Sequence, residues 1–285
     1  MITPDLPLNR DEAQRYVSET AKTLGGGPQP CGHLACQKDS FKKSLESSRI
    51  LSYAPYEEKP LAVSSVKKGK KKKKNQRGED RLGGSPRRGY ALVLDDSVFF
   101  PEGGGQPSDT GRIVLNVSNG DTELSVSDVQ NVGGICVLSC TAPCNGEDLL
   151  LEALRDALDG GASIVRQVLD WDRRFDFMTQ HSAQHLVSAV ALDEEDLKTN
   201  SFSLQREALI SYIDFGVDPE VDIERHRDAI RRVENSANEL IRQNLSMTPK
   251  YLSLDDPEFK SKVRRKVVAD LREMHVDTMV KLGNS

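Results

Sequence analysis

The sequence contains few aromatic residues and no long apolar run. Phenylalanine, tryptophan and tyrosine make up 5% of the 285 residues, so the core must be built mainly from leucine, valine, isoleucine and alanine. No segment approaches the roughly 20 apolar residues that a membrane-spanning helix needs. The polar N-terminus also lacks the apolar centre of a secretory signal. We therefore expect a cytoplasmic protein with no membrane partner.

Cysteine is scarce as well, and none follows Cys144. Five cysteines in a long chain without a secretory signal do not indicate a disulfide framework. Cys136, Cys140 and Cys144 recur every four residues, which on a helix would align three metal-binding thiolates. Pro143 and the β-forming residues around it favour strand and turn instead. We expect buried free thiols here rather than a metal site.

Positive charge is concentrated in one low-complexity segment, residues 64–89, which includes the lysine-rich run from Lys67 to Lys74. This segment has no apolar face that could offset the entropy of ordering, so it is predicted to be a disordered insert. Such a tract is either a solvated linker or a nonspecific ligand of phosphate backbones. Because the net charge of the chain is −5, any contact with RNA must come from local basic patches.

Hydrophobic periodicity divides the chain into a β-rich part and a mixed part, which predicts an α+β fold. Residues 1–33 are predicted to be a disordered extension, and residues 34–144 a small β-barrel of short strands joined by glycine turns. The remainder, residues 145–285, alternates strands and amphipathic helices. The elements predicted there are helices at 147–158, 175–192 and 219–243, and strands within 162–174 and 201–215.

Two histidines are separated by one helical turn in the predicted helix 175–192. His181 and His185 would share one helix face, with Cβ atoms about 6 Å apart. Two imidazoles so placed can hold one Zn²⁺ ion at about 2.0–2.1 Å from each nitrogen. The residue directly after His181 is Ser182 and not glutamate, which excludes the HExxH pattern of metalloproteases. The spacing alone also fits histidines that simply pack in the core or lie at the surface.

A glycine-rich segment follows the predicted strand at 90–100. It reads PEGGGQP, with Gly103, Gly104, Gly105 and Gln106 at its centre. Consecutive glycines allow positive φ angles or a close backbone approach, so the segment predicts a tight turn between strands. It lacks the Gly-Lys-Ser/Thr sequence and the following helix that would indicate a phosphate loop.

Four motifs in this order resemble the freestanding alanyl-tRNA editing proteins of the AlaX type, which are similar to the editing domain of alanyl-tRNA synthetase. They are PEGGGQP, RRFDFMTQHSAQHL, KTNSFSL and LSLDDPE, and the resemblance covers residues 34–62 and 90–259. It implies an N-terminal β-barrel followed by an α+β editing domain of the threonyl/alanyl-tRNA synthetase second-domain type. It also implies a zinc-dependent trans-editing hydrolase that deacylates mischarged Ser-tRNA(Ala) or Gly-tRNA(Ala) and spares Ala-tRNA(Ala).

The resemblance also assigns roles to particular residues. It implies that His181 and His185 hold zinc, and that Gln184, Thr199 and Ser201 are candidate contacts to the amino acid. The Gly-Gly-Gly-Gln segment is carried over as a structural motif. No residue is assigned as the catalytic acid or base.

The sequence departs from the family pattern at two places. Gln205 follows SFSL, where the family usually has glycine. The family continues after LSLDDPE into a strand and a Cys/His ligand pair, but this sequence ends at Ser285 without that pair, and His275 does not map onto it. We therefore expect an incomplete editing domain and weak or absent zinc binding. A noncatalytic tRNA-binding paralogue and a truncated product stay open beside the hydrolase.

Overall fold

The computed structural model describes residues 8–58, 87–117, 120–141, 154, 164–204, 211–244, 247–253, 256–257 and 278–284. The chain forms two compact units, Met1–Thr179 and Gln180–Ser285. Three predictions lie outside the described residues: the helix at 147–158 except for Leu154, the insert up to residue 86, and the thiol of Cys144. The last three residues of the predicted insert, 87–89, belong to a strand.

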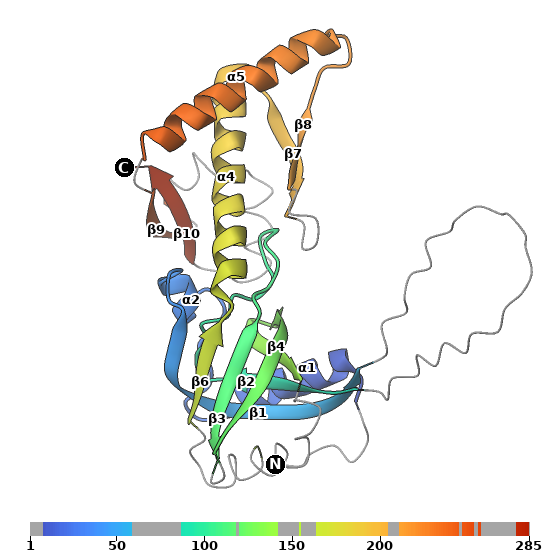
Figure 1. The fold of residues 1–285 in the computed structure, drawn as a ribbon, viewed down its shortest axis with the longest axis vertical. Coiled ribbons are helices and arrows are strands. Elements are labelled where there is room, and N and C mark those ends of the chain that lie inside the picture. The colour runs from blue at the N-terminus through green and yellow to red at the C-terminus, as the bar shows by residue number, and fades with distance from the viewer. Residues whose placement is uncertain are drawn as a thin grey trace, which may run out of the picture. The chain divides into compact units, whose positions relative to one another are not determined.

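Six antiparallel strands of the first unit form a closed barrel, in the order β1-β2-β5-β4-β3-β6 (Figure 1). They are β1 (Ser44–Glu58), β2 (Arg87–Leu94), β3 (Gly111–Val117), β4 (Gly120–Val132), β5 (Ile135–Thr141) and β6 (Ile164–Leu169). The predicted barrel is confirmed, but its predicted end at residue 144 is wrong. Strand β6 pairs with both β1 and β3, and this closure leaves the sheet without unpaired edges.

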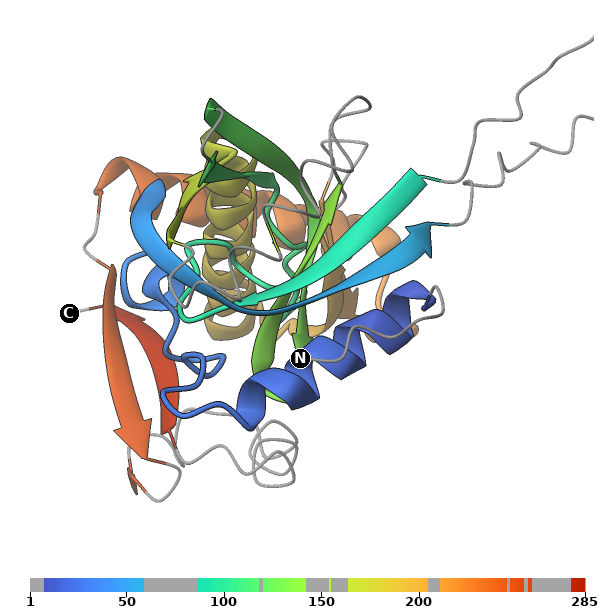
Figure 2. The same ribbon diagram turned by 90° about the horizontal axis from the view of Figure 1, so that it is seen from below.

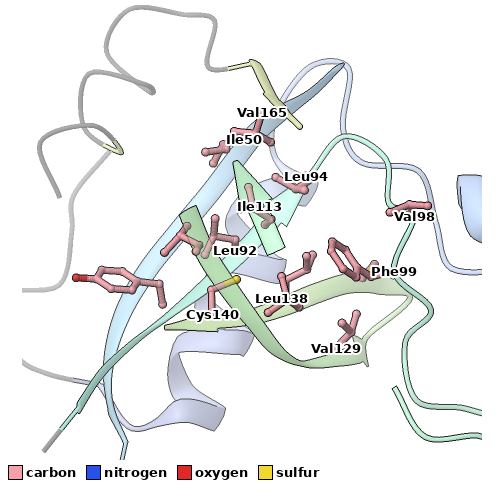
Figure 3. Close-up of a cluster of buried hydrophobic side chains, with 14 of the residues drawn as sticks. Ile50, Leu92, Leu94, Val98, Phe99, Ile113, Val129, Leu138, Cys140 and Val165 are labelled. Carbon is pink, nitrogen blue, oxygen red and sulfur yellow. The ribbon is translucent and has the colours of Figure 1, made fainter. Parts of the chain in front are cut away.

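The barrel interior is filled by aliphatic side chains from several strands together with a few aromatic rings and thiols. Figure 3 shows Ile50, Leu92, Ile113, Leu138 and Cys140 among the side chains of this cluster. The cysteines of β5 are free and buried, which confirms the prediction for two of the three. Burial raises the pKa of both β5 thiols above the ordinary value, so they stay protonated and serve as small apolar groups.

Helix α1 (Arg10–Lys22) covers the outer face of the barrel beside β1 and β2 (Figure 2). The predicted disordered extension is therefore wrong for these residues. A capping box starts the helix: the Asn9 side chain accepts from Glu12 N, and the Glu12 carboxylate accepts from Asn9 N, both at 3.0 Å. The buried stripe consists of small residues, which let the helix lie close to the strands: Ala13, Val17 and Ala21.

Helix α4 (Trp171–Glu195) begins in the first unit and continues into the second. The predicted helix 175–192 is confirmed and starts four residues earlier. The predicted pair of strands at 201–215 is confirmed as β7 (Lys198–Ser203) and β8 (Tyr212–Gly216), which form a two-stranded sheet. The other described elements are α2 (Ala35–Lys38) in the first unit and α5 (Ile223–Arg242), β9 (Met247–Ser253) and β10 (Thr278–Asn284) in the second.

The core of the second unit is small. Val190 and Ala191 of α4 pack with Ala229 and Val233 of α5, together with Leu197. The predicted helix at 219–243 is confirmed as α5, but its predicted apolar stripe is wrong in part, because Ile223, Ile230 and Ile241 are exposed. None of the helices that the structure describes combines the length and apolar character needed to cross a lipid bilayer.

Candidate functional site

The paired histidines lie on α4 as the sequence predicts. Their Nε2 atoms are 3.0 Å apart, and the two rings stack with centroids 4.8 Å apart. The ring of Phe202 on β7 lies 5.8 Å from the His181 ring and 6.3 Å from the His185 ring. The aromatic side chain therefore covers one side of the imidazole pair and helps to fix its orientation.

Partial burial favours the neutral form of both imidazoles, more strongly for the half-buried His181 than for the exposed His185. It lowers the pKa of His181 to about 4, with the neighbouring His185 as a second cause. Burial also lowers the pKa of His185. Neutral imidazole is the form that offers a nitrogen lone pair to a metal ion. The two rings are thus in the protonation state that metal binding requires near pH 7.

The two Nε2 atoms lie at hydrogen-bonding distance from each other, and the spacing that one shared metal ion requires is only slightly longer. Two nitrogens at about 2.05 Å from a tetrahedral ion would be about 3.3 Å apart, close to the 3.0 Å found between the Nε2 atoms. Across the described parts of the chain, no group of three or more His, Cys, Asp or Glu side chains is placed to hold a metal. Among the described residues, His181 and His185 are therefore a pair without a third such side chain placed to complete a metal site.

A short chain of hydrogen bonds runs beside the histidines. Gln184 Nε2 donates to Ser188 Oγ at 2.9 Å, and Thr199 Oγ1 donates to the same oxygen at 2.8 Å. The side chain of Gln184 is buried, and its Oε1 has no hydrogen-bond partner in the described structure. A buried acceptor without a partner among the described residues is a candidate to accept a hydrogen bond from a ligand or from ordered water.

Ser188 was not among the sequence candidates. It follows Gln184 by four residues, so helical spacing alone could have indicated that the two side chains meet. Its contact with Thr199 comes from a different element, β7, and carries no signal in the local sequence. The structure thus brings Gln184 and Thr199 together through a residue between them.

Ser201 does not join this group. A register shift lies between Thr199 and Ser201 in the pairing of β7 with β8, because Asn200 is inserted as an extra residue. The insertion reverses the side-chain alternation, so Thr199 and Phe202 face α4 while Ser201 lies exposed on the opposite side. The predicted amino-acid contact at Ser201 has no support from its position.

The glycine-rich segment forms a tight turn in the first unit, as predicted. Gly103 N donates to Gln106 O at 3.1 Å, and Gln106 N donates to Gly103 O at 3.0 Å. The two residues between them, Gly104 and Gly105, have φ angles of 59° and 80°. Positive φ at both central positions is the geometry of a type I′ turn, which explains the glycines without a ligand.

A buried ion pair links Arg174 of the helix motif to Asp109, two residues after the glycine-rich segment, and sequence reasoning missed it. Arg174, at the start of α4, donates from Nε to the two carboxylate oxygens of Asp109 at 3.0 and 2.9 Å. It also donates to Ser40 O at 3.1 Å and Val98 O at 2.8 Å. Burial raises the pKa of Asp109, and the Arg174 guanidinium opposes that shift. The guanidinium thus connects the start of α4 with three other segments of the first unit, through Asp109, Ser40 and Val98.

No family model matches the chain, but individual proteins do. It is 33% identical over 223 residues to "Alanyl-tRNA editing protein Aarsd1" of Bos taurus, covering 78% of this chain and 39% of that protein. It is 31% identical over 193 residues to "Alanyl-tRNA editing protein AlaX-L" of Pyrococcus horikoshii, covering 68% and 41%. It is 30% identical over 176 residues to "Alanine--tRNA ligase" of Halorubrum lacusprofundi, covering 60% and 16%. The chain spans less than half the length of each relative.

The barrel, the helix with paired histidines and these matches together place the chain among the alanyl-tRNA editing proteins. Its matched relatives include the proteins named Aarsd1 and AlaX-L, so the resemblance given by the sequence motifs is confirmed.

Proposed function

We propose that this protein is a trans-editing hydrolase that cleaves the ester between a wrong amino acid and tRNA(Ala). The observation that carries the proposal is the pair of neutral imidazoles on α4, with Nε2 atoms 3.0 Å apart, in a chain homologous to alanyl-tRNA editing proteins. Such an enzyme would act on charged tRNA in the cytoplasm.

Gln184 is the residue best placed to recognise the amino acid. Its Nε2 is occupied by Ser188, which leaves the buried Oε1 to accept from the hydroxyl or the ammonium group of a seryl ester. A site that depends on such a bond discriminates strongly against a substrate without the donor, because the buried acceptor is then left unpaired. Preference for serine over alanine follows from this geometry if the seryl hydroxyl is the donor.

His181 and His185 are the residues that would hold Zn²⁺. When bound there, the ion would supply Lewis-acid polarisation or a water of lowered pKa. With two protein ligands among the described residues, zinc should dissociate more readily than from a four-ligand site. Elemental analysis after dialysis tests this: we expect substoichiometric zinc in the wild-type chain and less in His185→Ala.

The experiment that tests the function measures release of labelled amino acid from Ser-tRNA(Ala), Gly-tRNA(Ala) and Ala-tRNA(Ala) in the presence of zinc. We expect cleavage of a mischarged ester and not of Ala-tRNA(Ala), and its loss in His181→Ala. His33→Ala is the matched control, because His33 is exposed in the first unit. Wild-type protein that releases no amino acid above the uncatalysed rate would contradict the proposal.

A second function is favoured by one observation, the absence of a third metal ligand from the described residues. A noncatalytic tRNA-binding module would keep the fold without completing the metal site. It predicts binding of tRNA(Ala) without turnover, and binding that His181→Ala leaves unchanged. Filter binding measured on the same preparations as the deacylation assay separates the two functions.

A further inference from the structure

An exposed cluster of aromatic rings lies in the first unit, outside the histidine site. The ring of Trp171 is 6.0 Å from the ring of Phe41 and 5.5 Å from the ring of Phe175. Phe41 is 63% exposed and Phe175 is 47% exposed. The Nζ atom of Lys43 lies 4.5 Å from the centroid of the Trp171 ring. We call these four residues the aromatic surface.

Packing and hydrogen bonds fix the positions of the residues of the aromatic surface. Trp171 packs against the barrel core, while Phe41 extends into solvent from a connection that is held by several hydrogen bonds. Phe41 N donates to Asp39 Oδ1 at 3.0 Å, and Leu169 N donates to Lys43 O at 3.0 Å. The buried Arg174 guanidinium donates to Ser40 O, the carbonyl of the residue between Asp39 and Phe41. Several large apolar rings held side by side at the surface are more typical of an interaction site than of a single exposed apolar residue.

The charge around the rings suits an anionic partner. Three lysines stand in the six residues 38–43, and they are Lys38, Lys42 and Lys43. The one carboxylate in that segment, Asp39, accepts the hydrogen bond from Phe41 N. Asp172, next to Trp171, is exposed and Asp176, next to Phe175, is half-buried, and both reduce the local positive charge. We therefore expect stacking on the rings to contribute more to affinity than charge does.

We propose that the aromatic surface binds single-stranded RNA by stacking bases on Phe41 and Phe175, with Lys43 contacting phosphate. Adjacent aromatic rings flanked by lysines are the combination that binds single strands, because every base has a π-face and every linkage a negative charge. The stacking surface follows from the geometry alone. The choice of RNA over DNA rests on the proposed function, in which the substrate ends in an unpaired RNA strand.

The test uses the full chain and a fluorescein-labelled single-stranded RNA of about eight nucleotides, without any attached amino acid. The same oligomer with abasic residues keeps the phosphates and lacks the bases. We expect the wild-type protein to bind the base-containing RNA at least about fivefold more tightly than the abasic strand, from one stacked base. Fluorescence of Trp171, the single tryptophan of the chain, should be quenched by the base-containing strand only.

The variants separate stacking from hydrophobicity. Phe41→Leu combined with Phe175→Leu keeps apolar side chains and should weaken binding of the base-containing RNA at least about fivefold, with no effect on the abasic strand. Phe41→Tyr should retain the wild-type affinity, because the ring is kept. Tyr212→Leu is the matched control, since Tyr212 is 53% exposed but lies in the second unit. Lys43→Gln should reduce the slope of log affinity against log salt by about 1.

Equal affinity of the wild-type protein for the two strands would overturn the proposal, and so would leucine variants that bind as the wild type does. A matching DNA strand that binds more tightly than the RNA would overturn the choice of RNA. If sedimentation showed self-association that the leucine variants abolish, in the absence of RNA binding, the surface would be an interface between two copies. None of these outcomes depends on ester hydrolysis, so the RNA-binding proposal and the proposed deacylase function are tested independently.

Discussion

Replacing Asp109 by alanine should be among the most destabilising single changes in the barrel unit. Asp109 is fully buried and Arg174 is 2% exposed, and the guanidinium donates to both carboxylate oxygens. Removal of the carboxylate leaves a buried cation without its counterion, which costs about 3–5 kcal/mol. Because domains are stable by only about 5–15 kcal/mol, the loss should be a large part of the total.

The measurement is urea unfolding followed by tryptophan fluorescence. Trp171 is the single tryptophan, and it is partly buried against the barrel core, so its emission reports unfolding of the first unit. The control is Glu123→Ala, which removes the exposed ion pair with Arg112, 3.4 Å long with both side chains about half exposed. An exposed pair of this kind contributes about 0–1 kcal/mol. Equal losses in Asp109→Ala and Glu123→Ala would refute the reasoning.

A double variant tests whether the cost comes from the stranded charge. Arg174→Met alone leaves a buried carboxylate, and Arg174→Met with Asp109→Ala leaves no charge. The double variant should lose clearly less stability than the sum of the two single losses, by about 1–3 kcal/mol. Additive losses would mean that the two side chains act independently, against the geometry.

The single variant Arg174→Met should also depend on pH. Burial raises the pKa of Asp109, and the guanidinium opposes this shift, so its removal should raise the pKa further. A carboxyl whose pKa is higher in the folded than in the unfolded protein binds more protons when folded, and stability then increases as the pH falls. Arg174→Met should therefore lose less stability near about pH 5 than near about pH 7. A larger loss at the lower pH would contradict the assigned cause.

Two further predictions concern the site and the barrel. Ser188→Ala removes the hydroxyl that accepts a hydrogen bond from the Gln184 amide. The loss of this bond, about 1–1.4 kcal/mol, should lower kcat/KM for Ser-tRNA(Ala) about five- to tenfold. Ser188→Thr keeps the hydroxyl and should retain most activity in the same deacylation assay. Gly111→Ala would place a Cβ atom 2.3 Å from Val168 O, and should destabilise the barrel by about 3 kcal/mol in urea unfolding. Gly25→Ala, with nothing within 4 Å, should unfold like the wild type.

The strands of the barrel could be predicted from the sequence only where a local sequence pattern indicates them. Alternation and glycine turns indicate β2 to β5, whereas β6 follows a long segment and the sequence alone assigns it to the next domain. Its pairing with β1 and β3 is non-local, and no pattern within Ile164–Leu169 encodes it. Helix α1 was missed because its buried stripe is made of alanine and valine, which give little contrast with the polar residues between them.

The features of the candidate site also differ in whether the local sequence predicts them. The stacking of His181 on His185 follows from helical spacing and was predictable. The exclusion of Ser201 was not, because one inserted residue, Asn200, reverses the alternation of β7. Such bulges depend on how two strands pair, and the hydrogen bond from Thr199 to Ser188 depends on how a strand packs on a helix. Both are tertiary facts that a linear motif does not contain.

The motif RRFDFMTQHSAQHL combines residues of two kinds on one helix. Arg174 stabilises the barrel through Asp109, whereas Gln184 presents an acceptor that is buried and unpaired. An unpaired buried acceptor lowers the stability of the folded protein by about 1–3 kcal/mol. The two partners of a buried ion pair, in contrast, compensate each other's charge. The first half of the motif therefore contributes to the fold through Arg174, and its second half holds Gln184 and the two histidines of the candidate site. Gln184 thus combines a structural contact, the hydrogen bond from its Nε2 to Ser188 Oγ at 2.9 Å, with an acceptor that the described residues leave unpaired.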